Sequence, residues 1–210
     1  MLRISRYGRF EVGLFAFVFL AACFTSKYVA ALLLFPLLFF VYFYRDPDRE
    51  ADAEEGWLSP ADGKVVEILD VEHEYLGKAV KIGIFMNGYD VHVNRFPTTG
   101  TVEYVRYVPG KKKVAFAPKA SDVNERFYVG AKSEDGRFLL CQIAGIMARR
   151  ITKDVAIGDE YGRGERYGMI KLGSKVDLYL PDAIRPCINV GDRVTAGKTV
   201  VGVKRIERAE

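Results

Sequence analysis

The sequence predicts a mainly β protein, a compact β-sandwich or barrel, preceded by an apolar helical hairpin. Two observations support this fold class. After residue 57, short runs of Val, Ile, Tyr and Phe alternate with polar residues, and Gly, Asp and Asn recur as turn signals about every ten residues. Before residue 50, by contrast, a long stretch contains almost no charge. We therefore expect two domains, residues 1–50 and 51–210.

The apolar stretch runs from Phe10 to Tyr44, and Glu11 and Lys27 are its only charges. It divides at "TSK" into two pieces of roughly 17 residues each, near the lower end of the length that crosses a bilayer. Pro36 is expected to kink the second piece. The pattern therefore predicts two helices that form a membrane-inserted hairpin.

Basic residues flank the hairpin on both sides: Arg3, Arg6, Arg9, Arg45 and Arg49. Because basic flanks stay on the cytoplasmic side, we expect a cell-membrane protein whose residues 51–210 lie in the cytoplasm. A cleaved signal peptide or a lipoprotein site at "LAAC" is the alternative. The second apolar run that follows "LAAC" argues against both.

The candidate strands of the second domain are taken from their alternation of apolar and polar residues. They cover residues 63–73, 78–86, 100–108, 126–133, 138–145, 169–181 and 198–206. The run 169–181, "MIKLGSKVDLYLP", is unusual because Gly173 and Ser174 stand in its middle. A glycine inside a strand marks a kink, a bulge or a close backbone approach.

Composition excludes several classes of function. The chain has 31 Lys and Arg against 27 Asp and Glu, and a net charge of +4 is too small to predict a nucleic-acid partner. Three widely spaced cysteines and two histidines support neither a disulfide framework nor a metal centre. We expect no metal and no nucleic acid.

The common motifs for nucleotide binding and for hydrolysis are absent from the sequence. What remains is a scattered polar set: Asp62 in "SPADG", Asp90, His92 and Arg95 in "NGYDVHVNRFP", and Ser174 in "KLGS". Taken singly, three of these residues have ordinary interpretations: Asp62 as a turn former, His92 as a hydrogen-bonded structural histidine and Ser174 as a strand serine. The glycine-rich "YGRGERYG" is interpreted as a loop.

Two further segments resemble a pair of elements found in biotinyl/lipoyl-type barrels. "SPADGKVVEI" lies near the start of the second domain and "INVGDRVTAGKTVVGV" near its end. The lysine triplets that carrier modules bear at a hairpin tip, "MKM" and "DKA", do not occur. The resemblance therefore implies elements of a barrel-sandwich hybrid fold without the carrier function.

The motifs taken together resemble the phosphatidylserine decarboxylase proenzymes of the short bacterial and archaeal type. "KLGS" is similar to the family's "LGS" processing motif, and "FYRDPDR", "SPADGKV", "FMNGYDVHVNRFPTTG", "NERF" and "CQIAGIMARRI" are similar to other blocks in the family's order. The resemblance covers essentially the whole chain.

This resemblance implies that the chain cuts itself between Gly173 and Ser174. The Ser174 hydroxyl attacks the carbonyl of Gly173, elimination releases the upstream chain, and hydrolysis with loss of ammonia leaves a pyruvoyl group. The products are a β subunit (1–173) and an α subunit (174–210). The covalent pyruvoyl cofactor then decarboxylates the membrane phospholipid phosphatidylserine to phosphatidylethanolamine, because its ketone withdraws electrons from the bound amino acid.

The resemblance also implies roles for individual residues. Asp62 matches the aspartate that assists self-cleavage, and Ser174 matches the serine that becomes pyruvoyl. Many members carry "HxxHxP"; here His92 takes the first histidine position and Arg95 the second. An arginine cannot act as a base at neutral pH, so His92 is the expected proton carrier. The candidates for binding phosphate or carboxylate are Arg95, Arg149 and Arg150, unless they are solvated surface arginines.

Three alternatives remain open at this point. The substrate could be archaetidylserine, since nothing in the second domain reads the lipid tail. The chain could instead be a membrane-tethered biotinyl/lipoyl-like binding module, or a structural adaptor that has lost activity. A homodimer is expected only by analogy with the family.

Overall fold

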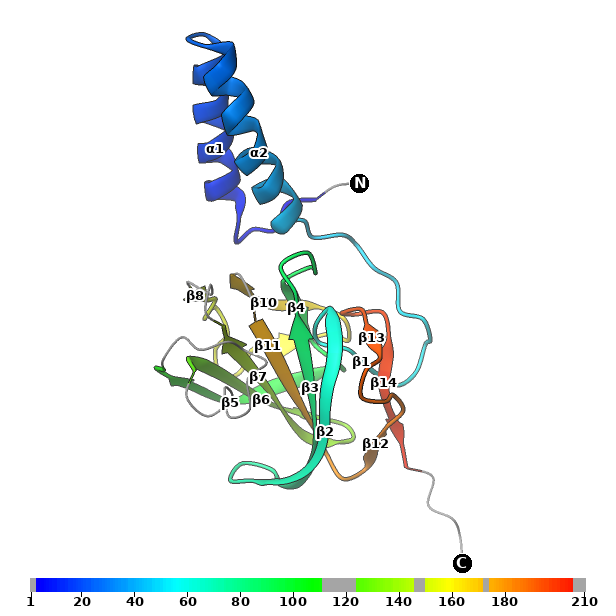
Figure 1. The fold of residues 1–210 in the computed structure, drawn as a ribbon. Coiled ribbons are helices and arrows are strands. Elements are labelled where there is room, and N and C mark those ends of the chain that lie inside the picture. Colours follow the sequence, from blue (N-terminus) through cyan, green and yellow to red (C-terminus); the bar gives the residue numbers. More distant parts are fainter. Residues whose placement is uncertain (1–2, 111–123, 146–149, 172–173, 206–210) are drawn as a thin grey trace, which may run out of the picture. The chain divides into compact units, whose positions relative to one another are not determined.

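The computed structural model describes residues 3–110, 124–145, 150–171 and 174–205. Its elements fall into two compact units (Figure 1). The helical unit comprises Met1–Asp48 and Gly88–Val91, and the β unit comprises Arg49–Asn87 and His92–Glu210. The mainly β fold with an N-terminal helical hairpin agrees with the expectation from sequence.

The helical unit is an antiparallel pair, α1 (Arg9–Cys23) and α2 (Lys27–Phe43). Both helices are apolar around most of their circumference, and they meet through aromatic contacts such as Phe15 against Phe40, with ring centroids 4.4 Å apart. Pro36 lies inside α2, where it removes one backbone donor. Among the described residues, no helix combines the length and the apolar character needed to cross a membrane.

The loop Gly88–Val91 belongs to the helical unit, although it is far from the helices in sequence. The carbonyl oxygen of Tyr89 accepts hydrogen bonds from Arg45 Nη2 at 2.6 Å and from Tyr42 Oη at 3.2 Å. The end of α2 and this loop are thus joined by charged and polar contacts.

The strands of the β unit form three sheets. In chain order, the described strands are β1 (Trp57–Leu58), β2 (Gly63–His73), β3 (Gly77–Met86), β4 (Val93–Arg95), β5 (Gly100–Val108), β6 (Arg126–Ser133), β7 (Gly136–Ala144), β8 (Arg150–Ile151), β9 (Glu160–Tyr161), β10 (Arg166–Lys171), β11 (Ser174–Leu180), β12 (Ile184–Pro186), β13 (Arg193–Val194) and β14 (Val200–Lys204). The large sheet has the order β13-β2-β3-β11-β7-β6-β5-β9, and the two small sheets have the orders β1-β14-β12 and β4-β10-β8.

Strand β11 lies in the interior of the large sheet. It pairs antiparallel with β3 from Ser174↔Met86 to Leu180↔Val80, and with β7 from Ser174↔Ala144 to Tyr179↔Leu139. Its inward side chains, Val176, Leu178 and Leu180, belong to the main apolar core. A strand that is paired on both sides is held at every residue by its neighbours' backbones.

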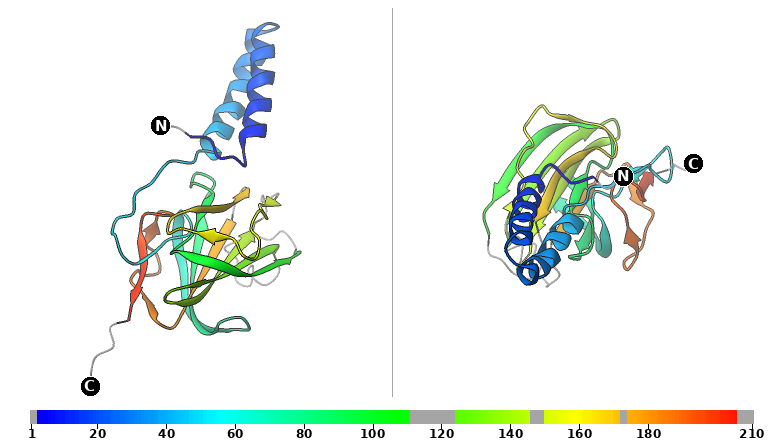
Figure 2. Two further views of the ribbon diagram at one scale, coloured as in Figure 1. Left: turned by 180° about the vertical axis from the view of Figure 1, so that it is seen from behind. Right: turned by 90° about the horizontal axis from the view of Figure 1, so that it is seen from above.

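The large sheet is strongly curved, as the two further views show (Figure 2). The tip of the β2–β3 hairpin reaches β5, where the rings of Tyr75 and Tyr104 stack with centroids 5.0 Å apart. A bulge in β2 between Val65 and Glu67 adds twist. The curvature explains how a single sheet encloses much of its own core.

One strand prediction was wrong in its extent. We expected a single strand over 169–181, but β10 ends at Lys171 and β11 begins at Ser174, and the two strands pair in different sheets. Alternation of apolar and polar residues continues through both strands, so it gives no sign of the change of sheet.

The two segments that resemble biotinyl/lipoyl elements pair with each other. Val194 of β13 lies opposite Gly63 of β2, and the backbone N–H of Ser59 donates to the Thr199 carbonyl at 2.8 Å. The start and the end of the β unit are therefore joined directly. The relation to the biotinyl/lipoyl barrels themselves stays a prediction.

Candidate active site

Ser174 is the first residue of β11 and is completely buried. It lies opposite Met86 of β3 on one side and Ala144 of β7 on the other. Its hydroxyl donates a hydrogen bond to the Met86 sulfur, with Oγ and Sδ 3.4 Å apart. A thioether is a weak acceptor, so this contact positions the hydroxyl but does not activate it.

Two amide side chains that the sequence analysis did not single out lie beside this serine. Asn94 Nδ2 is 3.8 Å from the same Met86 sulfur, and Asn94 Oδ1 accepts a hydrogen bond of 2.7 Å from Gln142 Nε2. Both side chains are completely buried. The available signal was Gln142 itself, a polar residue inside the otherwise apolar run "FLLCQIA".

His92 is completely buried and directly precedes β4. Its carbonyl oxygen accepts a hydrogen bond of 3.4 Å from the backbone N–H of Ile170 in β10. Two residues further on, Asn94 reaches the sulfur that also contacts Ser174. The segment that carries His92 and the start of β11 are therefore connected through Met86.

Asp62 is held in a network of its own. Its carboxylate accepts two hydrogen bonds from Arg49, at 2.5 and 2.8 Å, and one of 2.8 Å from the backbone N–H of Ala196. A bidentate pair of this kind fixes the orientation of the carboxylate. Arg49, which the sequence analysis counted among the basic flanks of the hairpin, instead belongs to the β unit.

The loop that carries Asp62 is bonded to β4, because the backbone N–H of Arg95 donates to the Pro60 carbonyl at 2.9 Å. The Arg95 side chain is buried, and its Nη1 donates to the Gly164 carbonyl at 3.0 Å. It passes directly over Gly197, where a Cβ would lie 2.5 Å from Arg95 Cδ. Arg95 therefore contributes to the packing between loops, whatever else it binds.

Of the three remaining predicted site residues, the structure describes one, Arg150. Gly173 and Arg149 lie outside the described residues. Arg150 begins β8, where its backbone is paired with Lys171 of β10. Within the described ranges, no group of three or more His, Cys, Asp or Glu side chains is arranged to hold a metal ion.

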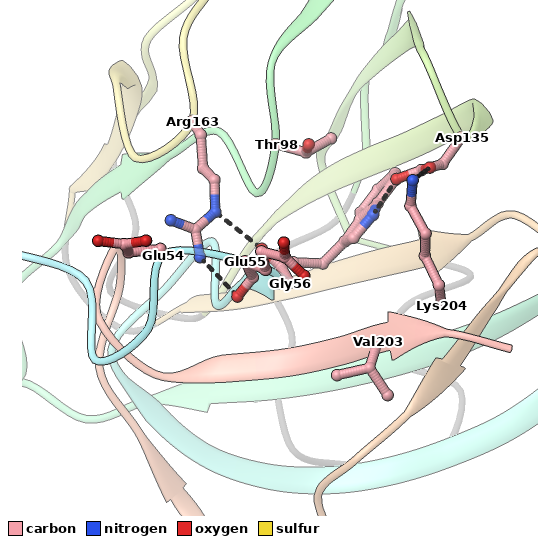
Figure 3. Close-up of a pocket in the computed structure, with 9 residues that line it drawn as sticks. Glu54, Glu55, Gly56, Thr98, Asp135, Arg163, Val203 and Lys204 are labelled. Atoms are coloured by element: carbon pink, nitrogen blue, oxygen red, sulfur yellow. Dashed lines mark hydrogen bonds and ion pairs between the residues drawn. The ribbon is translucent and has the colours of Figure 1, made fainter. Parts of the chain in front are cut away.

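A cavity of about 390 Å³ opens elsewhere on the β unit (Figure 3). Its cations are already engaged: Lys204 Nζ lies 2.8 Å from Asp135 Oδ1, and Arg163 donates to the carbonyls of residues 53, 55 and 56. Trp57 Nε1 also donates to Asp135, at 3.1 Å. These contacts tie the C-terminal strand β14 to the β6–β7 turn, and they are structural in character.

The geometry around Ser174 suits chemistry that must exclude water. A serine hydroxyl, a histidine segment and two amides converge in a fully buried part of the core, where electrostatic interactions are stronger than in solvent. The carboxylate of Asp62 is fixed by Arg49 in a separate network.

Comparison with known proteins gives one consistent family. The family model described as phosphatidylserine decarboxylase matches residues 37–202. The phosphatidylserine decarboxylase proenzyme of Symbiobacterium thermophilum is 40% identical over 203 residues, which cover 95% of this chain and 94% of that protein. The proenzyme of Nitratidesulfovibrio vulgaris is 42% identical over 210 residues, 98% and 97% of the two chains. The proenzyme of Carboxydothermus hydrogenoformans is 46% identical over 169 residues, 79% of each chain. The chain therefore belongs to the phosphatidylserine decarboxylase family.

Proposed function

We propose that the chain is a proenzyme that cuts itself between Gly173 and Ser174 and then decarboxylates phosphatidylserine to phosphatidylethanolamine. The observation that carries the proposal is the similarity to decarboxylase proenzymes along nearly the full length of both chains. The buried Ser174 at the start of β11 is consistent with it.

The position of Ser174 supports the proposed self-cleavage. Strand β10 ends at Lys171 and belongs to the β4-β10-β8 sheet, whereas β11 begins at Ser174 and belongs to the large sheet, so the proposed cut lies directly before the first residue of β11. Strand β11 remains paired with β3 and β7, which both precede the cut. The resulting subunits, 1–173 and 174–210, would therefore stay together.

His92 is the proposed proton carrier. It takes the proton of the Ser174 hydroxyl during cleavage, and later delivers a proton to the substrate carbon that has lost carbon dioxide. Its support is the contact chain from Ser174 through Met86 to Asn94, two residues from His92. Asp62, fixed by Arg49, is proposed to assist the cleavage electrostatically.

The pyruvoyl group derived from Ser174 supplies an electron-withdrawing ketone, which makes loss of carbon dioxide from an amino acid feasible without a metal. The chain's own residues fit such a group, because its precursor Ser174 is already buried between β3 and β7 beside a polarisable sulfur. Arg95, Arg149 and Arg150 are the proposed partners of the substrate's phosphate or carboxylate.

Residues 1–50 are proposed to insert into the cell membrane as a helical hairpin, with residues 51–210 on its cytoplasmic side. Large apolar side chains are exposed along both helices, Phe17, Leu32 and Phe35 among them, and these are suited to lipid. The proposal also includes barrel-sandwich elements, from the resemblance of residues 59–68 and 188–203 to biotinyl/lipoyl-type barrels, and a homodimer, by family analogy.

Intact-mass measurement of the purified protein tests the function directly. We expect two fragments corresponding to residues 1–173 and 174–210, the smaller one lacking a free N-terminal amine and carrying a carbonyl that reacts with hydroxylamine. Incubation with phosphatidylserine vesicles should release carbon dioxide. A single uncut chain without a reactive carbonyl and without carbon dioxide release would overturn the proposal.

A further inference from the structure

The two faces of β11 carry different chemistry. Side chains two apart in a strand share a face, so Ser174, Val176 and Leu178 point to the core. Lys175 and Asp177 point to the opposite face, and yet both are almost completely buried. Burying two charges directly after the proposed cleavage site is costly, so their partners need an explanation.

Their partners form what we call the β11 anchor: Lys175, Asp177 and Glu67. The Lys175 ammonium lies 3.0 Å from Asp177 Oδ1 on its own strand, and it donates a hydrogen bond to Glu67 Oε1 on β2. Strand β3 lies between β2 and β11, so the Lys175–Glu67 pair spans two strand spacings, about 9.5 Å. The pair therefore ties β11 to a strand with which it makes no backbone ladder.

Strand β3 is shaped to allow this crossing. Gly83 lies opposite both Glu67 and Asp177 in the ladders, and a Cβ built on it would come within 2.7 Å of both Glu67 Cγ and Lys175 Cε. A side chain at this position would occupy the space that the two partners use. Glycine at 83 thus provides the passage for the anchor.

Within the anchor, Lys175 and Glu67 are ionised in the folded protein, whereas burial raises the pKa of Asp177 against the lowering effect of Lys175. Burial alone would lower the pKa of Lys175, but the charges of Asp177 and Glu67 outweigh burial and raise it. Burial likewise would raise the pKa of Glu67, but hydrogen bonds from Lys175 and Lys81 outweigh burial and lower it. The Lys175–Glu67 pair is therefore a true ion pair at neutral pH.

We propose that Lys175 is a positioning residue, which holds residue 174 in place once the bond before it has been cut. This inference rests on the proposed function. In the uncut chain, residue 174 is tethered on both sides. After cleavage it is a chain terminus, and its nitrogen has left as ammonia, so any ladder hydrogen bond donated by that nitrogen is lost. Chain termini fray unless something ties them down.

Lys175 directly follows residue 174, and its ion pair with Glu67 is the interaction that restrains the new chain end. Because its side chain leaves the strand on the face opposite to that of Ser174, it acts through the backbone and does not reach the reacting atoms. The consequence for the mature enzyme is a fixed direction of the reactive ketone. The consequence for the uncut chain is smaller, because the peptide bond supplies the same restraint.

The test compares Lys175→Met with Lys81→Met in the mature, self-cleaved enzyme. Lys81 Nζ contacts the same Glu67 oxygen, at 2.9 Å, but it lies within β3, far from any chain end. We expect Lys175→Met to lower kcat about tenfold or more, as loss of a charged hydrogen bond allows, with KM changed much less. Hydroxylamine should capture the carbonyl faster by a similar factor. Lys81→Met should leave both rates within about twofold of the parent, and Lys175→Arg should restore most of kcat.

Glu67→Gln serves as a second variant if Lys175→Met fails to fold, because it weakens the cross-strand pair and leaves Lys175 with Asp177. Like Lys175→Met, it should lower kcat and raise the rate of capture by hydroxylamine. The inference is overturned if the cut, carbonyl-bearing Lys175 or Glu67 variants keep parental kcat and parental capture rates, or if Lys81→Met changes them equally. Failure of the parent protein to be cut would instead overturn the proposed function.

Discussion

The helical unit and the β unit treat large apolar side chains in opposite ways. In the helical unit they are mainly exposed, including Phe17, Leu32 and Phe35. In the β unit they are packed between curved sheets, where Ile82, Phe138 and Leu178 are completely buried. The β unit also buries polar side chains in its interior, among them Ser174, His92 and Asn94.

This difference separates two tasks. Exposed apolar surface is unfavourable in water and is typical of sites that contact lipid or another apolar partner. Buried polar groups, on the other hand, reduce stability unless they are bonded, and they are retained where chemistry needs them. We therefore expect changes in the helical unit to alter binding to membranes, and changes in the β unit to alter cleavage, stability or catalysis.

The largest effect is expected from Ser174→Ala. Without the hydroxyl there is no nucleophile, so the protein should remain one chain and have no decarboxylase activity. Ser26→Ala is the matched control in the helical unit, since Ser26 precedes α2 and makes no side-chain cap. A denaturing gel and a carbon dioxide assay read both variants. Cleavage of the Ser174 variant, or loss of cleavage in the Ser26 variant, would break the division of tasks.

The next effect concerns lipid. Replacing both Phe17 and Phe35 by Glu removes two exposed aromatic side chains from the hairpin and adds charge. Each buried aromatic contributes about 1.5–3 kcal/mol, so sedimentation with phosphatidylserine vesicles should fall by a factor of about 100 or more, while self-cleavage continues.

Tyr107→Glu is the matched control for this experiment, because Tyr107 is an exposed aromatic residue of the β unit. It should leave vesicle binding unchanged. Equal losses in the two variants would show that apolar exposure in the helical unit has no special role.

A leucine pair measures the same contrast as stability. Leu178 in β11 is 0% exposed, whereas Leu32 in α2 is 75% exposed. Leu178→Ala should lower the free energy of unfolding by about 2–5 kcal/mol, because it leaves a cavity in the core. Leu32→Ala should change it by less than about 0.5 kcal/mol. Denaturant unfolding in detergent compares them, and similar losses would contradict the assignment of Leu178 to a packed core.

The smallest effect concerns pH and His73. Burial lowers the pKa of His73 below its usual 6.5, with Arg106 acting in the same direction and Glu74 against it. Its Nδ1 also accepts a hydrogen bond of 3.1 Å from the Tyr75 backbone, which requires the neutral ring. Its contribution is thus complete above pH 6.5 and is lost as pH falls towards the lower folded pKa.

The unfolding temperature should therefore fall modestly between about pH 7.5 and 5.5, by less than Leu178→Ala costs. His73→Gln keeps an acceptor and does not titrate in this range, so it should flatten the profile. A profile equally steep in that variant would assign the pH dependence to another group.

The alternation of apolar and polar residues predicted strands well where turn residues flank the strand at both ends. The ranges 100–108 and 126–133 coincide with β5 and β6, because alternation and flanking turn residues mark both ends. The pattern failed at 169–181, where β10 and β11 belong to different sheets although the alternation of apolar and polar residues continues through both. Which sheet a strand joins depends on distant partners, and sequence periodicity holds no information about them.

The candidate site divides in the same way. Motif resemblance predicted Ser174, His92 and Asp62 as site residues, but it did not indicate that Met86 would contact both Ser174 and Asn94, because these contacts depend on the register of β11 against β3. Nor did it indicate that Arg49 binds Asp62. Gln142 and Lys175 were missed because a polar residue in a strand has no meaning until the face it occupies is known.

The position of β11 between β3 and β7 determines how the mature protein can be recovered after denaturation. In the continuous chain, the covalent connection keeps β11 close to β3 and β7, so the strand pairs with them at a high effective concentration. Once the peptide 174–210 is separate, refolding becomes a second-order reaction between two dilute partners, and β3 and β7 must close around an incoming strand. We therefore expect the precursor to refold readily after dilution from denaturant, whereas the mature enzyme should recover in proportion to its concentration or aggregate.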